Sequence, residues 1–224
     1  MPQIRTVIFD LDGTLIDSAP EIGTAVNQLL AIHGRPAVSV EQIRTMVGDG
    51  SPVLIRKAFA ATGQDLDPDD APAVLDQFIG IYESQGADPH SLYPGVTATL
   101  EKLHIQGLRL GLCTNKPERV TLEVLTQLGL RRFFGAVAGG DTLPVRKPDG
   151  RHIAWVVEQL EADIGSAIMV GDHDNDVAAA RSAGLPVVAV SYGYPRTPVA
   201  ALGADMVIDR FGDLVDVLER LGVR

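Results

Sequence analysis

The sequence is poor in cysteine, in positive charge and in long apolar stretches, and each shortage excludes a class of protein. Cys113 is the single cysteine, so no disulfide framework and no cysteine-rich zinc site can form. It lies in the apolar stretch LRLGLCTN, which indicates a buried structural thiol. No stretch approaches the roughly 20 apolar residues of a membrane span, and the first letters, MPQIRTVIFD, do not resemble an export signal. We therefore expect a cytoplasmic protein that does not act at a membrane.

Acidic residues outnumber basic ones, with 29 Asp and Glu against 19 Lys and Arg and a formal net charge of −10. Binding to a nucleic-acid backbone depends on clustered Lys and Arg that displace counterions, so nucleic acid is not an expected partner. The 224 residues are 46% hydrophobic, which is enough for one large domain or two small ones. The sequence does not indicate an oligomeric state.

From about residue 92, short apolar runs alternate with helical patterns. LRLGLCTN precedes PERVTLEVLTQLG, AVAGG precedes GRHIAWVVEQLEA, and AIMVGD precedes NDVAAARSAG; the runs PVVAVSYG and ADMVIDR and a helix over FGDLVDVLERLG follow. Unalternated runs of Val, Ile and Leu are typical of strands buried on both faces, and helices between them favour parallel crossovers. With TVIFD as a further strand, the pattern predicts an α/β fold with a doubly wound parallel sheet, a Rossmann-like core.

The segment over residues 17–92 has a different pattern. Its successive amphipathic stretches, from APEIGTAVNQLLAIHG to DDAPAVLDQFIGIYESQG, predict helices and no strand. Because this segment directly follows the first strand, we interpret it as an inserted small helical cap domain, joined by two short hinges to a core made of residues 1–16 and 93–224. Asp17 is expected at the first hinge, as a hinge residue or a helix cap.

Several predicted strands end in polar residues, and in open parallel sheets ligands gather at the carboxyl ends of the strands. Taken singly, these residues have ordinary explanations as turn acids, a helix N-cap or a solvated lysine. Together, the acids would repel one another strongly at one sheet edge, so a cation is expected among them. The residues are Asp10, Thr114, Asn115, Lys147, Asp172, Asp174 and Asp176.

Mg²⁺ is the natural cation for this edge, because it takes carboxylate ligands, keeps several waters and reaches phosphate oxygens. No group of His or Cys favours zinc, and His173, which lies among the acids, is expected to tune the site or face solvent. Mg²⁺, Lys147 and the Thr114 hydroxyl would together receive an anion. Phosphate fits all of these partners.

Four motifs carry a resemblance to a known family. In chain order they are DLDGT, CTN, KPDG and GDHDND, and they extend over most of the chain. With these motifs and the helical insertion, the sequence resembles the haloacid dehalogenase-like phosphatases. The resemblance implies a Mg²⁺-dependent hydrolase of small phosphate esters.

The resemblance also implies roles for individual residues. Asp10 corresponds to the nucleophile, which forms an aspartyl-phosphate. Asp12 corresponds to the acid that protonates the leaving alkoxide and then activates water. Thr114 and Asn115 would hold the phosphoryl oxygens, and Lys147 would neutralise them and restrain Asp10.

The metal would, by the same resemblance, be held by four residues of the first and fourth motifs. The Asp10 carboxylate, the Asp12 backbone carbonyl and Asp172 would bind it, and Asp176 would support this shell directly or through water. An acid at position 12 also points to an oxygen leaving group, since dehalogenases and phosphonate-cleaving members of the superfamily lack one there.

Further segments, including VGDGSPVL, LYPGV and GGDTLPVRKP, are similar to bacterial phosphoglycolate phosphatases, which implies hydrolysis of 2-phosphoglycolate to glycolate and phosphate. One departure is KPDG, where these enzymes carry a second proline; Asp149 can instead cap the following helix. The alternatives are a phosphatase of another small phosphate ester or a sugar-phosphate mutase on the same scaffold. A phospho-receiver signalling module is a third, but its phosphoacceptor stands on a later strand and it is about half as long.

Phosphoglycolate has a carboxylate close to its phosphate, so we expect a small anion site in the cap. Gly48, Asp49 and Gly50 precede a predicted helix whose free N–H groups could receive a carboxylate, although the Asp49 charge would oppose it unless turned away. Arg56 or Lys57 could add positive charge. Equally, both could be solvated surface residues, and GDG a simple turn.

Overall fold

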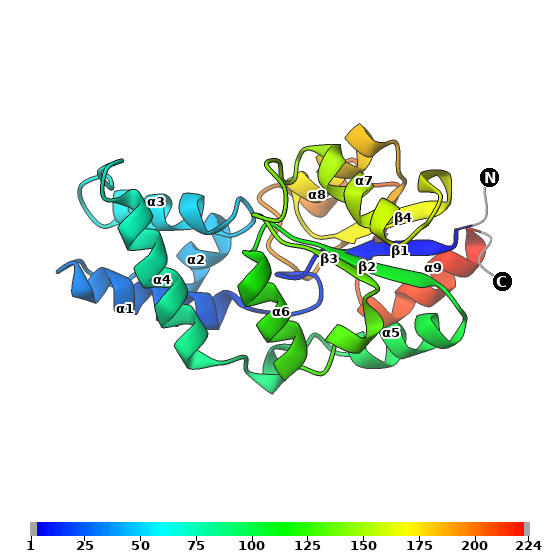
Figure 1. Ribbon diagram of the computed structural model, residues 1–224, viewed down its shortest axis with the longest axis horizontal. Helices are drawn as coiled ribbons and strands as arrows, with labels where there is room; N and C mark the ends of the chain where they lie inside the picture. The colour runs from blue at the N-terminus through cyan, green and yellow to red at the C-terminus, as the bar shows by residue number, and fades with distance from the viewer. Residues whose placement is uncertain (1–3, 222–224) are drawn as a thin grey trace.

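The computed structural model describes residues 4–221 and contains a six-stranded sheet between two layers of helices (Figure 1). The strand order is β3-β2-β1-β4-β5-β6, and every neighbouring pair in it is parallel. The predicted α/β class and doubly wound sheet are therefore confirmed. The strands are β1 (Thr6–Phe9), β2 (Arg109–Cys113), β3 (Ala136–Ala138), β4 (Ala167–Gly171), β5 (Val187–Val190) and β6 (Met206–Ile208).

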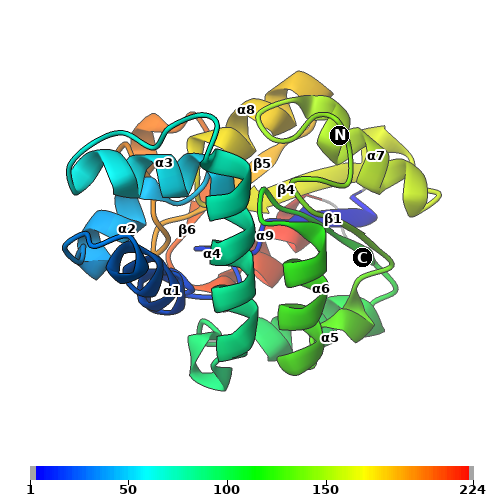
Figure 2. The same ribbon diagram turned by 60° about the vertical axis from the view of Figure 1, so that its left-hand side comes forward.

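Both faces of the sheet are buried, as the unalternated apolar runs predict. On β1, Val7 and Phe9 belong to the apolar cluster on one face, and Ile8 belongs to the cluster on the other. Helices α5, α6 and α9 cover the first face, and α7 and α8 cover the second (Figures 1 and 2). These helices are α5 (Val96–Ile105), α6 (Glu118–Gln127), α7 (Gly150–Gln159), α8 (Asp174–Ala183) and α9 (Leu214–Arg220).

Helix α5 is not among the elements that the sequence analysis predicts. It follows Gly95, which has a left-handed conformation, and its first turn contains the β-branched residues Val96 and Thr97, which are weak helix formers. Packing compensates for this weak propensity, because Val96, Leu100 and Leu103 lie on one side of the helix and are buried against the sheet.

Four helices lie between β1 and α5 in the chain and form a group at one end of the molecule, beyond the edge of the sheet (Figures 1 and 2). Helix α1 packs against the other three, and α3 also contacts α2 and α4. The predicted helices of this segment are present, with ends shifted by a few residues. They are α1 (Ala19–Ile32), α2 (Val40–Met46), α3 (Ser51–Ala61) and α4 (Ala71–Gln85).

The two segments that join this helical group to the sheet run side by side. The Asp17 N–H donates to the Ser91 carbonyl (2.7 Å), and the Tyr93 N–H donates to the Leu15 carbonyl (3.1 Å). Asp17 lies in one of these two segments, and its role as a hinge residue remains a prediction. It does not cap α1, whose N-cap is Ser18; its carboxylate accepts hydrogen bonds from Arg44 and the Tyr194 hydroxyl. The division at residues 16/17 and 92/93 remains a prediction, and its outer ends, residues 1–3 and 222–224, lie outside the described residues.

No helix within residues 4–221 combines the length and the apolar character needed to cross a lipid bilayer.

Candidate active site

Three neighbouring strands end at the same edge of the sheet, and each is followed by a predicted site residue. Asp10 follows β1, Thr114 follows β2 and Asp172 follows β4. Because β1 lies between β2 and β4 and all three are parallel, their carboxyl ends bring these side chains together. All three residues are buried.

The chain turns back sharply after Asp10. The Leu15 N–H donates to the Leu11 carbonyl (2.9 Å), and the Gly13 N–H donates to the Ile16 carbonyl (2.8 Å). Gly13 has φ +84°, and a Cβ atom added there would lie 2.4 Å from Asp172 Oδ2. The glycine of DLDGT is thus required both for the left-handed turn and for the close approach of the fourth motif.

Lys147 lies between the carboxylates of the first and fourth motifs. Its Nζ is 2.8 Å from Asp10 Oδ1 and 2.6 Å from Asp176 Oδ1, and all three residues are buried. Burial opposes the charged ammonium, but the two carboxylates outweigh it and raise the pKa of Lys147 well above its ordinary value. Burial raises the pKa of Asp10 to about 6, against the opposing effect of Lys147.

Asp172 and Asp176 are held by donors from several elements. Asp172 accepts hydrogen bonds from the Thr14 hydroxyl (3.0 Å) and the Tyr194 N–H (2.7 Å). Asp176 Oδ2 accepts from the N–H groups of Asp172 (3.1 Å) and His173 (2.9 Å). Burial, with repulsion from Asp176 and Asp10, raises the pKa of Asp172 well above its ordinary value.

The three buried carboxylates fit a metal ion. Oxygens of Asp10, Asp172 and Asp176 all lie within 4.8 Å of one another, and Lys147 is the single ammonium paired with them in the described structure. One positive charge against three negative ones leaves the cluster short of positive charge, and a cation with oxygen ligands would supply it. The Asp12 carboxylate is not part of this group, and the predicted role of its backbone carbonyl remains a prediction.

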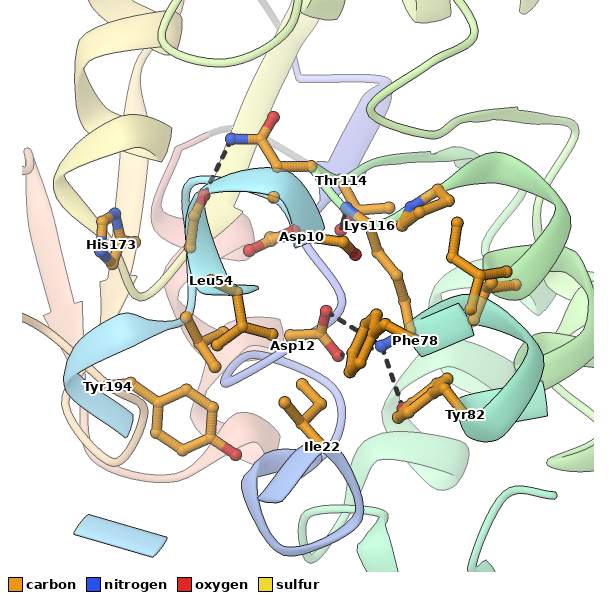
Figure 3. A pocket seen from close by; sticks show the side chains of 18 of the residues that line it. Asp10, Asp12, Ile22, Leu54, Phe78, Tyr82, Thr114, Lys116, His173 and Tyr194 are labelled. Carbon is orange, nitrogen blue, oxygen red and sulfur yellow. Dashed lines mark hydrogen bonds and ion pairs between the residues drawn. The ribbon is translucent and has the colours of Figure 1, made fainter. Parts of the chain in front are cut away.

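The Asp12 carboxylate is instead fixed by two donors. The Ser18 hydroxyl donates to its Oδ1 (2.6 Å). Lys116 Nζ lies 3.1 Å from the same oxygen (Figure 3). Lys116 also donates to the Tyr82 hydroxyl (3.0 Å) of α4. Sequence reasoning missed Lys116, although the lysine directly after the strand-end Thr-Asn pair in CTNKP was a signal that could have found it.

Thr114 and Asn115 are both buried at the site, but they are engaged differently. The Thr114 hydroxyl accepts the Lys116 N–H (3.3 Å) and lines the cavity described below. The Asn115 amide group donates to the carbonyls of Gly48 (2.8 Å) and Lys147 (2.9 Å). The side-chain donors of Asn115 therefore connect two loops, one of which carries Lys147, and its contact with a phosphoryl oxygen remains a prediction.

The loop at residues 48–50 lies directly against the sheet edge. The Gly48 carbonyl accepts from Asn115 and from Asn175 (3.1 Å). Asp49 accepts from Asn175 (2.9 Å), Lys57 (2.8 Å) and Arg196. Partial burial opposes ionisation of Asp49, yet these hydrogen bonds, led by the one from Arg196, lower its pKa well below the ordinary value. The Asp49 charge is compensated on the side facing the core.

The predicted cap residues thus separate into two groups. Gly48 and Gly50 line the cavity, together with Ser51 at the start of α3. Lys57 pairs with Asp49, Arg56 is exposed, and neither lines the cavity. The structure does not bring Arg56 or Lys57 to the carboxylates of the core.

A cavity of about 50 Å³ lies between the sheet edge and the helical group (Figure 3). Its polar side is formed by the core residues, and its other wall is apolar. This volume counts only the space open to the centre of a water-sized sphere, of which one water molecule needs roughly 10–15 Å³. The cavity is therefore large enough for a few small groups. The apolar wall includes Ile22, Val47, Leu54, Phe78, Ile79 and Val120.

His173 lines the cavity and is buried, so the predicted alternative that it faces solvent is wrong. Its Nδ1 accepts the Asn175 N–H (3.2 Å), which makes His173, and not Asp174, the N-cap of α8. Burial lowers the pKa of His173 below its ordinary value. Asp174 is the first residue of the helix and is half-exposed.

A family profile for haloacid dehalogenase-like hydrolases matches residues 7–190. The chain belongs to this family. Among curated relatives of this hydrolase, a phosphoglycolate phosphatase of Caulobacter vibrioides is 44% identical over 209 residues, which cover 93% of this chain and 88% of the relative. A phosphoglycolate phosphatase of Vibrio cholerae is 39% identical over 222 residues, covering 97% and 98% of the two chains.

Solved structures agree with this membership of the hydrolase family. A crystal structure from Haemophilus somnus, described as a predicted phosphoglycolate phosphatase, has a TM-score of 0.89 and 32% identity, and the match covers 97% of this chain and 99% of that one. The phosphate complex of CbbY from Rhodobacter sphaeroides has a TM-score of 0.80 at 23% identity, covering 95% and 96%, and shows the same fold.

Proposed function

We propose that this hydrolase is a Mg²⁺-dependent phosphatase whose preferred substrate is 2-phosphoglycolate. The observation that carries the proposal is the placement of Asp10, paired with Lys147, beside a small cavity that Asp12 also lines. This arrangement supplies a nucleophile and a second carboxyl group around one small substrate. The naming of the curated relatives supports phosphoglycolate as that substrate.

In the first step, an Asp10 carboxylate oxygen attacks phosphorus in line with the ester bond. The new bond joins Asp10 to phosphorus, the bond from phosphorus to the alkoxide oxygen breaks, and Asp12 gives its proton to that oxygen. With a pKa of about 6, Asp10 is largely ionised at neutral pH and can act as nucleophile. Lys147 holds the Asp10 carboxylate in place through its contact at 2.8 Å.

In the second step, Asp12, now a carboxylate, takes a proton from water while the water oxygen attacks phosphorus. The bond between phosphorus and Asp10 breaks, and inorganic phosphate leaves. Ser18 and Lys116 fix the Asp12 carboxylate at 2.6 and 3.1 Å, so the same group is held in position for both proton transfers. Thr114, at the end of β2, is placed to hydrogen-bond a phosphoryl oxygen.

Asp10 and Asp172 would hold Mg²⁺, with the Asp12 backbone carbonyl and with support from Asp176. The hard oxygen donors of this group, without His or Cys, favour Mg²⁺ among divalent cations. When bound, Mg²⁺ supplies positive charge that offsets the carboxylates and the phosphoryl oxygens. Asp176 is itself held by Lys147 and two backbone N–H groups, which suits a supporting role.

We further propose that residues 17–92 act as a cap over a core of residues 1–16 and 93–224. The cavity lies between the two groups and is lined by residues of both, so a movement of the helical group would change its size and the access of substrate to it. The paired segments around Leu15 and Tyr93 are the natural hinge, because they are the two connections between the groups.

The test is release of inorganic phosphate from a panel of phosphomonoesters: 2-phosphoglycolate, 3-phosphoglycerate, glycerol 3-phosphate, glucose 6-phosphate and ethyl phosphate. We expect 2-phosphoglycolate to give the highest kcat/KM with Mg²⁺, and no release with EDTA. Asp10→Asn is expected to abolish turnover, while the matched variant Asp69→Asn, at an exposed loop residue, retains it. A higher kcat/KM for another ester would contradict the substrate, and turnover by Asp10→Asn would contradict the mechanism.

A further inference from the structure

Phosphoglycolate carries a second anionic group, and the cavity offers few cations to meet it. Lys147 is enclosed by Asp10 and Asp176, while Arg56 and Lys57 point elsewhere. Among the residues that the structure describes, Lys116 is the one lysine or arginine that lines the cavity. A carboxylate in the cavity that pairs with a Lys or Arg side chain would therefore pair with Lys116.

Lys116 has a donor to spare. Its ammonium carries three N–H groups. One is directed to the Asp12 carboxylate at 3.1 Å and a second to the Tyr82 hydroxyl at 3.0 Å (Figure 3). The second Asp12 oxygen lies farther from Nζ, at 3.4 Å, so the two oxygens of that carboxylate can share one N–H. Asp12 and Tyr82 are the only acceptors of Lys116 Nζ among the described residues, and the residue is 7% exposed and lines the cavity, which leaves a third N–H for a group bound there.

The position of Lys116 beside Asp12 limits how far the substrate carboxylate can lie from the leaving oxygen. As proton donor, Asp12 must approach the leaving oxygen to hydrogen-bond distance, and Lys116 Nζ contacts the same carboxylate. In 2-phosphoglycolate the carboxylate carbon lies two bonds of roughly 1.5 Å each from the leaving oxygen. A carboxylate so close to that oxygen reaches Lys116, whereas a neutral group leaves the buried ammonium with one donor unmatched.

The apolar walls strengthen this contact. Leu54 and Phe78 from the helical group line the cavity and reduce the contact of a bound group with water (Figure 3). A hydrogen bond between two charged groups is stronger where water is excluded. Tyr82, whose hydroxyl accepts from Lys116 and whose ring centroid lies 4.5 Å from Nζ, keeps the ammonium directed at this space.

Building on the proposed function, we propose that Lys116, positioned by Tyr82, binds the substrate carboxylate and selects phosphomonoesters with a carboxylate one carbon from the ester oxygen. Specificity is thus supplied by the core residue that follows the second motif, and not by the cap cations Arg56 and Lys57. The same ammonium touches the group that transfers the proton, so recognition of the carboxylate and protonation of the leaving oxygen occur at one place.

The test compares kcat/KM for 2-phosphoglycolate with that for ethyl phosphate, in which a methyl group replaces the carboxylate. For Lys116→Met, both values fall because Asp12 loses a partner, but the ratio of the two falls by a further factor on the order of 10 to 100, the worth of one charged hydrogen bond. Lys116→Arg retains part of the ratio. Lys102→Met, the same change at an exposed lysine of α5, leaves it unchanged.

Two outcomes would overturn the proposal. If Lys116→Met lowers both substrates equally, Lys116 only positions Asp12; if Arg56→Met collapses the ratio, the cap supplies the anion site. Should Lys116→Met not fold, Tyr82→Phe decides: KM for 2-phosphoglycolate rises and KM for ethyl phosphate does not, and equal shifts refute the role. Absence of any preference in the unmodified enzyme would instead refute phosphoglycolate as substrate, which keeps the two failures distinct.

Discussion

Replacing Asp10, the proposed nucleophile, with Asn should stabilise the metal-free protein. Burial raises the pKa of Asp10 from 3.8 to about 6, which means that folding disfavours its charged form. The stability that the protonated group contributes is fully present below pH 4 and is lost as pH rises through about 6. A difference of about two pKa units corresponds to about 3 kcal/mol at neutral pH. Asn has the same shape without the charge, so Asp10→Asn escapes this loss.

The assay is urea unfolding in EDTA at pH 5 and pH 7, for wild type, Asp10→Asn and the control Asp69→Asn. We expect Asp10→Asn to be more stable than wild type at both pH values, by a margin that widens by about 1 kcal/mol between them. For a chain of this length, each kcal/mol raises Tm by about 2–4 °C. A margin that stays constant, or a less stable variant at pH 7, would show that the ion pair with Lys147 outweighs the burial of Asp10.

Adding Mg²⁺ should reverse the order. A ligand that binds only the folded state at about 100 times its Kd stabilises by about 2.7 kcal/mol. Wild type has three carboxylates to bind the ion and Asp10→Asn has two, so wild type gains more. Equal gains by both proteins would mean that the cation does not use Asp10.

Three further changes probe other parts of the molecule. Asp12→Ala should lower kcat by roughly 10²–10⁴ for 2-phosphoglycolate and for p-nitrophenyl phosphate alike, because water activation also needs Asp12; full activity on either ester would remove Asp12 from that role. Gly13→Ala should lower the free energy of unfolding by about 1–2 kcal/mol in urea and also abolish phosphate release, because its Cβ would meet Asp172. Gly34→Ala, at φ +65° in open space, should show the loss of stability without the loss of activity. Equal activities of the two variants would refute the contact with Asp172. Burial lowers the pKa of His152 from 6.5 to about 4, so folding stability is lost as pH falls from 6.5 toward 4. Between pH 7 and pH 5, the free energy of unfolding in urea should fall by about 2 kcal/mol more for wild type than for His152→Gln. Equal losses in the two proteins would contradict this role of His152.

The sequence was sufficient to predict the sheet and the gathering of Asp10, Thr114 and Asp172 at one edge of it, because both depend on local patterns. Runs such as TVIFD and AIMVGD are apolar without alternation, and each ends in an aspartate. Consecutive residues therefore predict the strand, its burial and the position of the site residue at its end. Helix α5 lacks such a signal: its propensity is weak, and what stabilises it is the packing of Leu100 and Leu103 on a distant part of the chain.

The remaining site features depend on contacts between segments far apart in the sequence. Lys116 reads as an ordinary lysine until Asp12 and Tyr82 are placed around it by two different elements. Conversely, Lys57 is a cation in the segment where the sequence predicts an anion site, but it forms an ion pair with Asp49. Pairing among charged side chains is decided by the fold, and a pattern of letters does not rank the alternatives.

The paired backbone at Leu15 and Tyr93 has a consequence for how such a chain can change over evolution. The two segments that connect the helical group to the sheet are hydrogen-bonded to each other. The ends of the inserted segment are therefore as close together as the ends of a tight turn, whatever the length of the segment. The entropic cost of closing a loop grows only slowly with the number of residues in it. A different set of helices could therefore be exchanged at this junction without altering the strand ends, which makes the junction a site where new specificities can be grafted onto unchanged chemistry.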